Sequence, residues 1–328
     1  MLSKTITILE CSRIFSLPMT ILSWLIIFTY GLTTGGNIVY GLIAFLGLVF
    51  VHLATNLIDD FFDYKYLIKQ VDFDKKEYLK CSQKTKCRYL INGMLKESQI
   101  ITTICIYLLI ALLCGLFLYL KCGVGVIYYA LIGAIIAILY PILSRFCLSE
   151  LCVALAYGPA LFGGVAYVML GGYSKEVFIL CIPSMIMTVV LLYIHTVMDY
   201  EFDTNEGKCT IANRFDSQLD SLVFLKALLV LAYLSPVLLC IFDILDWQVF
   251  FVYLTLPLAV DLYKSMAEFS CNPEKTPKRK LYHFPMEGLS KFEERGEAAF
   301  MMRMYQSRNL MIYYSLLLTI AIILVLGV

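Results

Sequence analysis

Charged residues are scarce in this sequence of 328 residues. Asp, Glu, Lys and Arg together make up 16% of the chain, whereas hydrophobic residues make up 60% and the mean hydropathy is +0.80. Length alone would suggest two soluble domains, but a soluble protein needs a much more polar surface. The composition therefore excludes a soluble protein and indicates a chain whose outer surface faces lipid.

The sequence also lacks the cysteine patterns of metal-binding modules. None of its twelve cysteines forms a C-x-x-C pair. Cys81 and Cys87 lie in a polar segment at a spacing that fits no metal module, and we expect them to be reduced thiols. Five of the others lie in apolar runs, where cysteine is a small hydrophobic residue: Cys105, Cys114, Cys152, Cys181 and Cys240.

Long apolar runs dominate the rest of the chain. A helix that crosses the hydrocarbon core needs about 20 mostly apolar residues. Polarity does not alternate within the runs, which argues against the strands of a membrane barrel. The pattern predicts an all-α, polytopic membrane protein, a single domain over 1–328 with its helices in a bundle around a central cavity. About nine spanning helices are expected at 15–34, 38–60, 99–120, 124–143, 149–170, 177–199, 219–242, 247–266 and 309–327.

Lysine and arginine are distributed unevenly among the segments between these runs. Of 26 basic residues, 24 fall on one side, and only Lys121 and Lys175 fall on the other. Because basic residues collect on the cytoplasmic side, we expect a multi-pass protein of the cell inner (cytoplasmic) membrane, with its N-terminus inside and its C-terminus outside. The long cytoplasmic segments would then be about 60–98, 200–218 and 267–308.

Two polar stripes stand at the cytoplasmic ends of two predicted helices. Both have the spacing i, i+4 and i+7, which places their members on one helical face: Asn56, Asp60 and Asp63 in the first, Asp199, Asp203 and Glu206 in the second. A histidine lies one turn deeper in each helix, at His52 and His195. We interpret His52 as a packing or helix–helix hydrogen-bonding residue.

Carboxylates stacked one turn apart repel one another, and a low dielectric near the bilayer increases that cost. Mg²⁺ between the stripes would remove the repulsion, and it binds oxygen ligands together with substrate phosphates. Lys84, Arg88 and Lys208 lie nearby and are suited to phosphate oxygens. Two other interpretations stay open: solvated helix ends, and a cation-coupled transporter, which would place its acids near the helix midpoints.

These stripes resemble the two aspartate-rich motifs of the UbiA-type intramembrane prenyltransferases. Asn56-x-x-x-Asp60-x-x-Asp63 is similar to the first motif, and Asp199-x-x-x-Asp203 is similar to the second. Gly207-Lys208-x-Thr210 resembles the pattern that follows it in the family. Further similarity lies in SRIFSLPMTILSW and in YPILSRFCLSELCVALAYGPALFGG, with Tyr140-Pro141, Glu150 and Gly158-Pro159 in register. The resemblance covers most of residues 10–215.

The resemblance implies a Mg²⁺-dependent enzyme that transfers an isoprenyl group from a polyprenyl diphosphate to an aromatic acceptor. The implied metal ligands are Asn56, Asp60, Asp63, Asp199 and Asp203. The implied catalytic residues are Asp60, Asp199, Tyr140 and His195, with Tyr140 facing the developing carbocation. The implied substrate-binding residues are Arg13, Asn56, Lys84, Arg88 and Lys208. The active site would open to the cytoplasm, and the partners would be both substrates and the bilayer, with no nucleic acid.

The NLxxDxxD and ELxxxxxxGP segments look most similar to the branch that prenylates 1,4-dihydroxy-2-naphthoate in menaquinone biosynthesis. His195 and Met198 stand where that branch usually has Asn and Arg, and Tyr64 stands where many family members have a further Asp. The acceptor could instead be a 4-hydroxybenzoate-like acid, a porphyrin or a glycerol lipid.

Three roles stay open at this level. His195 is either a base for a phenolic acceptor or a neutral hydrogen-bonding group in place of Asn. Arg13 is either a topology anchor or a group near the acceptor or diphosphate. The segment 267–308 is either an interfacial helix with a basic flank or a lid.

Overall fold

The computed structural model describes residues 2–70, 75, 87–172, 174–205 and 209–327. Within these ranges the chain is built from helices and contains no β-strand, as predicted. Eight helical stretches are long and apolar enough to cross a membrane, so the protein is a multi-pass membrane protein. The remaining predicted run, 124–143, forms a helix whose apolar part, Gly125–Tyr140, is shorter than the others.

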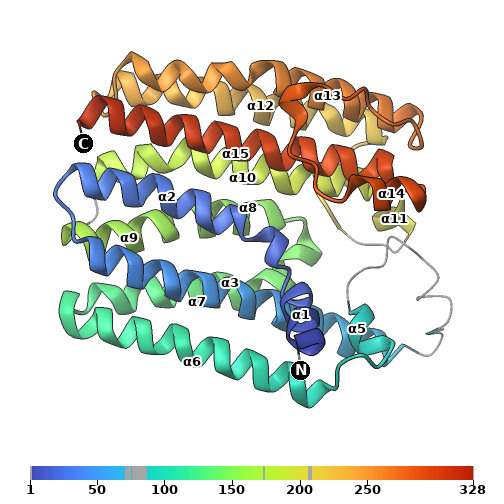
Figure 1. The fold of residues 1–328 in the computed structure, drawn as a ribbon, viewed down its shortest axis with the longest axis horizontal. Helices are drawn as coiled ribbons and strands as arrows, with labels where there is room; N and C mark the ends of the chain where they lie inside the picture. The colour runs from blue at the N-terminus through green and yellow to red at the C-terminus, as the bar shows by residue number, and fades with distance from the viewer. Residues whose placement is uncertain (1, 71–74, 76–86, 173, 206–208, 328) are drawn as a thin grey trace. The chain divides into compact units, whose positions relative to one another are not determined.

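The helices follow the predicted order closely (Figure 1). A short N-terminal helix, α1 (Leu2–Cys11), precedes the membrane-crossing part. The helices at the predicted crossing runs are α2 (Pro18–Thr33), α3 (Ile38–Leu67), α6 (Glu97–Cys122), α7 (Gly125–Leu143), α8 with α9 (Ser149–Leu155 and Leu161–Leu170), α10 (Lys175–Met198), α12 (Gln218–Ile241), η5 with α13 (Trp247–Thr255 and Leu256–Cys271), and α15 (Ala298–Leu326). The connections contain the short helices η1 (Ile14–Ser16), α5 (Arg88–Ile91), η2 (Ser144–Phe146), α11 (Tyr200–Asn205), η4 (Ala212–Arg214), η6 (Leu281–His283) and α14 (Leu289–Glu294).

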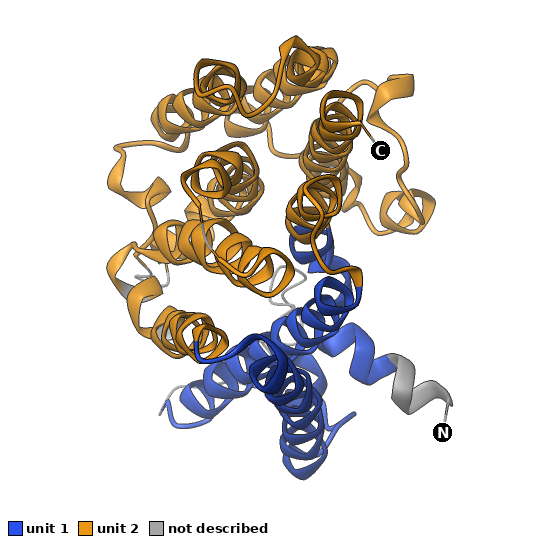
Figure 2. Cartoon of the chain, turned by 90° about the vertical axis from the view of Figure 1, so that its left-hand side faces the viewer, with its two compact units in different colours: residues 1–21, 39–124 blue, residues 22–38, 125–328 orange. Residues whose placement is uncertain are grey.

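The chain divides into two compact units, coloured separately in Figure 2. Unit 1 contains residues 1–21 and 39–124, and therefore α1, α3, α5 and α6. Unit 2 contains residues 22–38 and 125–328, with the remaining crossing helices. The expectation of a single domain over 1–328 stays a prediction.

Three helix ends differ from the sequence prediction. Helix α3 continues to Leu67 rather than ending near 60, and α13 continues to Cys271. Helix α15 begins at Ala298, so the predicted loop 267–308 shrinks to residues 272–297. The prediction counted apolar residues only, whereas a helix keeps its backbone hydrogen bonds after it leaves the hydrocarbon layer.

Helix α10 is the most buried crossing helix among those described. It begins after Ser174, whose side chain accepts a hydrogen bond from the backbone of Val177. It packs within unit 2 on α8, α12 and α15, and the Tyr193 hydroxyl donates to the carbonyl of Ser221 at the start of α12. This buried helix ends at Met198, directly before Asp199 of the second stripe.

Helices α8 and α9 are joined by the π-helical segment η3 (Ala156–Ala160). Pro159 has no amide hydrogen to donate, and Gly158 leaves helical geometry with φ −96° and ψ −107°. Beside this kink, a cavity of about 440 Å³ is lined by apolar side chains that include Tyr129, Leu155 and Phe178.

Candidate active site

The first stripe lies near the C-terminal end of α3, in unit 1. Asp60 is 2% exposed, and its carboxylate is salt-bridged by the guanidinium of Arg13. The same guanidinium lies 3.5 Å from a carboxylate oxygen of Asp59. Arg13 has a left-handed backbone, with φ 55°, in the short turn between α1 and η1. Because a buried carboxylate is costly without a positive partner, the guanidinium of Arg13 stabilises the charge of Asp60 in this position.

Helix α5 supplies further partners to Asp60. The Tyr89 hydroxyl donates to Oδ2 of Asp60 at 3.2 Å, and the Cys87 thiol donates to the Asp60 backbone carbonyl at 2.9 Å. Burial, and then the charge of Asp60, raises the pKa of Tyr89, so the hydroxyl keeps its proton and acts as a donor. Sequence reasoning missed both partners, because α5 is a short helix with no spacing signal.

A chain of hydrogen bonds lies along the same face of α3. The Asn56 amide nitrogen donates to the carbonyl of Ser12 at 3.1 Å and to Oγ of Ser16 at 3.2 Å. His52 is buried, with one ring nitrogen 2.7 Å from Ser16 and the other 2.7 Å from Thr20. These contacts agree with the interpretation of His52 as a hydrogen-bonding residue. The two hydrogen bonds of Asn56 use both hydrogens of its amide group and orient the side chain. Its carbonyl oxygen is then the atom that can accept or bind a further partner.

The second stripe lies in unit 2, where α10 ends. Asp199 is the residue that follows α10, and Asp203 lies in α11. The amide of Asp199 donates to the carbonyl of His195 at 2.9 Å, and the amide of Asp203 donates to that of Asp199 at 2.8 Å. The predicted one-turn spacing therefore persists, although α10 and α11 are separate helices. Asp203 is 2% exposed, whereas His195 and Asp199 are half-buried.

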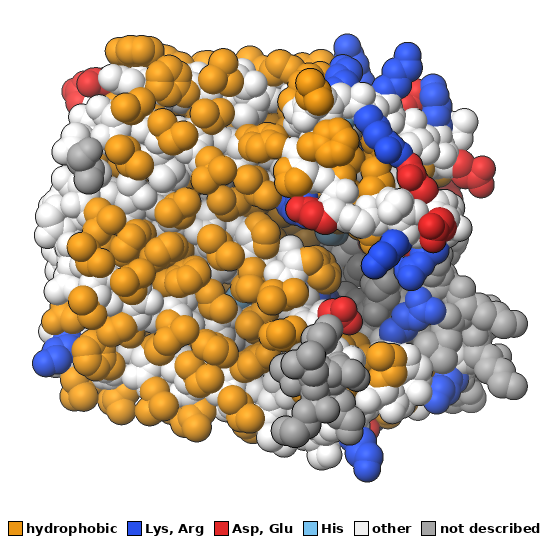
Figure 3. All heavy atoms as spheres, viewed as in Figure 1, with side chains coloured by type: hydrophobic (Ala, Val, Ile, Leu, Met, Phe, Trp, Pro, Cys, Tyr) orange, Lys and Arg blue, Asp and Glu red, His pale blue; other side chains and the backbone are white. Residues whose placement is uncertain are grey.

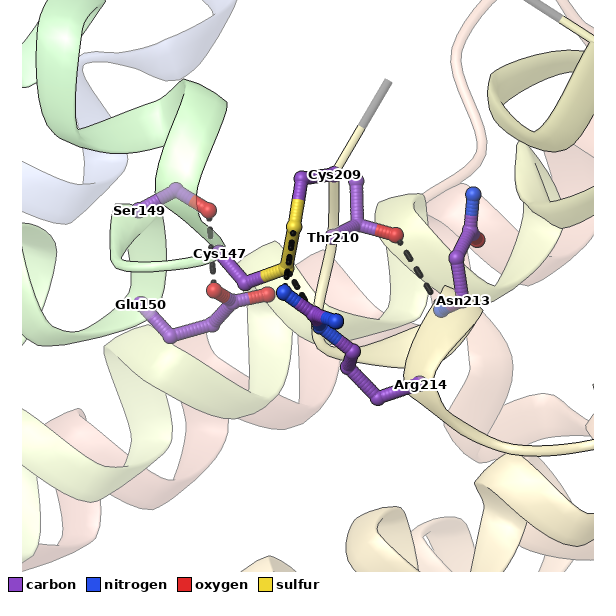
Figure 4. The surroundings of a disulfide bond; sticks show 7 residues. All are labelled: Cys147, Ser149, Glu150, Cys209, Thr210, Asn213 and Arg214. Carbon is purple, nitrogen blue, oxygen red and sulfur yellow. Dashed lines mark hydrogen bonds between the residues drawn. A yellow bond between two sulfur atoms is a disulfide. The ribbon is translucent and has the colours of Figure 1, made fainter. Parts of the chain in front are cut away.

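A disulfide bond connects the second stripe to another loop of unit 2. Cys147, at the end of η2, is bonded to Cys209, a few residues after α11 (Figure 4). The guanidinium of Arg214 donates to both sulfur atoms at 3.2 Å. The buried Glu150 lies beside the bond in Figure 4 and accepts a hydrogen bond from Ser149 at 2.8 Å. Sequence reasoning did not pair these cysteines. Cys87 is a free thiol as expected, whereas Cys81 lies outside the described residues.

The other predicted site residues divide into two groups. Lys84, Lys208 and Glu206 lie outside the described residues. Arg88 is half-buried at the start of α5, and Tyr140 is half-buried near the end of α7. The structure thus brings Arg13 together with Asp60, and it keeps Asp199 and Asp203 one turn apart.

The acids and Asn56 offer the hard oxygen donors that Mg²⁺ binds, so the residues fit this metal. Within the described ranges, no three His, Cys, Asp or Glu side chains are gathered closely enough to hold an ion by themselves.

Comparisons with known proteins show the family of the chain and a similar fold. The family model for the UbiA prenyltransferase family matches residues 17–286. No curated protein matches the chain. A solved structure of a digeranylgeranylglyceryl phosphate synthase is similar in fold, with a TM-score of 0.61 and 18% sequence identity. The match covers 98% of this chain and 100% of that one.

Proposed function

The chain belongs to the UbiA prenyltransferase family and is a prenyltransferase, and from this premise we propose that it carries out a Mg²⁺-dependent transfer of an isoprenyl group from a polyprenyl diphosphate. The observation that carries the proposal is the buried Asp60, which holds the guanidinium of Arg13. A carboxylate that already binds a cation in a lipid-facing protein is suited to metal-assisted binding of a diphosphate.

In this proposal Asn56, Asp60 and Asp63 hold one part of the metal–diphosphate assembly, and Asp199 and Asp203 hold the other. Bound Mg²⁺ would supply neutralisation of the charge that builds on the departing diphosphate. The proposal assigns contacts with phosphate oxygens to Arg13, Lys84, Arg88 and Lys208.

The reaction begins when the allylic C–O bond breaks and its electron pair leaves with the diphosphate. The acceptor attacks the resulting carbocation, and a proton is then lost from the acceptor. We propose that Tyr140 stabilises the cation through its ring face. We propose that His195 receives this proton or hydrogen-bonds the acceptor.

We propose 1,4-dihydroxy-2-naphthoate as the first acceptor to test, on the similarity of the Asn56 and Glu150 segments to that branch. A glycerol-based lipid acceptor is the second candidate, suggested by the fold of the digeranylgeranylglyceryl phosphate synthase. Met198 bears on this choice. It is buried and apolar where the naphthoate branch usually has Arg, so a cation for the acceptor carboxylate would have to come from another residue.

The test uses purified protein in lipid nanodiscs with Mg²⁺, a labelled polyprenyl diphosphate and a panel of three acceptors: the naphthoate, 4-hydroxybenzoate and a glycerol phosphate lipid. We expect one acceptor to be prenylated and diphosphate to be released only with Mg²⁺. Asp60→Asn and Asp199→Asn should lose turnover by about 100-fold or more while thermal unfolding still shows a folded protein.

The matched control is Asp216→Asn, which removes an exposed carboxylate in unit 2 and should keep full activity. Absence of transfer to any acceptor, together with Mg²⁺-driven uptake into vesicles, would overturn the enzyme assignment in favour of a transporter. Full activity in both stripe variants would show that Asp60 and Asp199 do not hold a metal that the reaction needs.

A further inference from the structure

Residues 272–297, here called the strap, fold back along the outside of unit 2 between α13 and α15 (Figure 1). Its midpoint contacts Asp261, which lies about ten residues, or about 15 Å, before the end of α13. The Tyr313 hydroxyl, well inside α15, donates to the backbone carbonyl of Phe284. The middle of the strap therefore lies beside residues of two membrane-crossing helices.

Polar contacts on the inner side hold the strap in this place. The carboxylate of Asp261 accepts hydrogen bonds from Lys280 and Tyr282, each at 2.6 Å, and lies 3.1 Å from Nε2 of His283. Asn309 donates to the carbonyls of His283 and Pro285, at 2.7 and 2.8 Å. His283 is only 1% exposed. The strap is thus a packed part of unit 2.

The outer side of the strap is apolar. Leu281 is 92% exposed, and Phe284 and Tyr282 are 44% and 38% exposed. They continue an apolar surface on the crossing helices, where Leu254 is 72% exposed and Leu316 is 40% exposed. A groove of about 360 Å³ between Tyr282 and these helices has the same apolar lining. In Figure 3 hydrophobic side chains cover most of the visible face, and charged ones gather near α14.

We propose that the strap inserts its tip, formed by Leu281, Tyr282 and Phe284, into the outer part of the hydrocarbon layer, where bilayer lipid chains cover it and enter the groove. The depth of the tip supports lipid as the occupant. The tip contacts Asp261 of α13, and Asp261 lies inside the apolar run 247–266 that is predicted to cross the membrane. Burial of apolar area supplies the attraction. Charge contributes less, because Lys275, Arg279 and Lys280 are already paired with Glu268, Glu293 and Asp261.

The experiment places one tryptophan at the tip. The two native tryptophans are replaced in Trp24→Phe and Trp247→Phe, and Leu281→Trp is added. The full-length protein is reconstituted in phosphatidylcholine vesicles that carry bromine at a shallow, a middle or a deep position of the acyl chains. We expect strong quenching at Leu281→Trp, greatest with the shallow bromine, and a blue-shifted emission.

Two matched variants bracket the result. Leu254→Trp reports a position on a crossing helix and should be quenched, whereas Lys291→Trp, exposed on α14, should be quenched little. The proposal is overturned if Leu281→Trp is quenched no more than Lys291→Trp, whether water or a second protein copy covers the tip. Thermal unfolding of each variant shows that it is folded. The measurement needs no substrate, so its outcome is independent of the proposed prenyl transfer.

Discussion

Arg303 is the largest of the side chains that are fully buried in the described part of the chain. Its guanidinium donates to the carbonyls of Ala299, Ser265 and Lys275, at 2.7, 2.9 and 3.0 Å. It also stacks on the ring of Phe269 at 4.8 Å. One arginine therefore joins the start of α15 to the end of α13 and to the strap.

We expect Arg303→Ala to lower the free energy of unfolding by about 2–4 kcal/mol, because it removes three charge-assisted hydrogen bonds and the packing of a long side chain. Thermal unfolding in detergent measures the effect. The control is Arg295→Ala, an exposed arginine of the strap. Equal unfolding temperatures for the two variants would contradict this role for Arg303.

A second prediction at the residue scale concerns Arg13. If Mg²⁺ binds Asp60, it must compete with the guanidinium that already lies there. We therefore expect Arg13→Gln to strengthen the apparent Mg²⁺ affinity by about tenfold, the order of an ordinary coupling between two ligands. The rise in unfolding temperature with added Mg²⁺ reports this affinity without activity.

The matched variant for this titration is Asp60→Asn, in which the Mg²⁺ effect should disappear with or without Arg13. A Mg²⁺ response that is the same in the parent protein and in Arg13→Gln would show that the arginine and the metal do not share this carboxylate.

At the scale of elements, the Cys147–Cys209 bond joins the loop before α8 to the loop after α11 and closes a loop of 62 residues. A crosslink of this span restricts the unfolded chain and stabilises the fold by about 4 kcal/mol in the loop-entropy account. The bond also tethers the segment that carries Asp203. Reduction should therefore lower both the unfolding temperature and the ordering of this segment.

Unfolding with and without dithiothreitol measures this contribution. The double variant Cys147→Ala, Cys209→Ala should unfold at the temperature of the reduced protein and should not respond to the reductant. Because the other described cysteines are free thiols, a response that persists in the double variant would mean that the stability comes from elsewhere.

At the scale of the whole molecule, the distribution of basic residues predicts a cytoplasmic N-terminus and an external C-terminus. The prediction requires α7, whose apolar part is the shortest of the nine, to cross the membrane. We expect a C-terminal alkaline phosphatase fusion to be active and a C-terminal green fluorescent protein fusion to be dark. A fusion at Asn272, in the strap, should give the opposite pattern. Equal signals from the fusions at Asn272 and at the C-terminus would place both points on the same side of the membrane and would contradict nine crossings.

Much of this fold follows from local properties of the sequence. Hydropathy runs place the crossing helices, because about 20 apolar residues in succession are stable in lipid only as a helix. Helical periodicity places Asn56, Asp60 and Asp63 on one face, since i, i+4 and i+7 coincide on any helix. Helix ends such as Leu67 and Ala298 were misplaced because hydropathy does not mark where a helix stops in water.

The sequence by itself determined the membrane class, the helix order and the spacing of both acidic stripes. Only the tertiary structure decided that Arg13 pairs with Asp60, 47 residues away, and that Cys147 bonds to Cys209, 62 residues away. It also decided that residues 272–297 form a strap along α13 and α15. The physical reason is that each helix obeys local rules, whereas contacts between distant residues depend on how the helices pack.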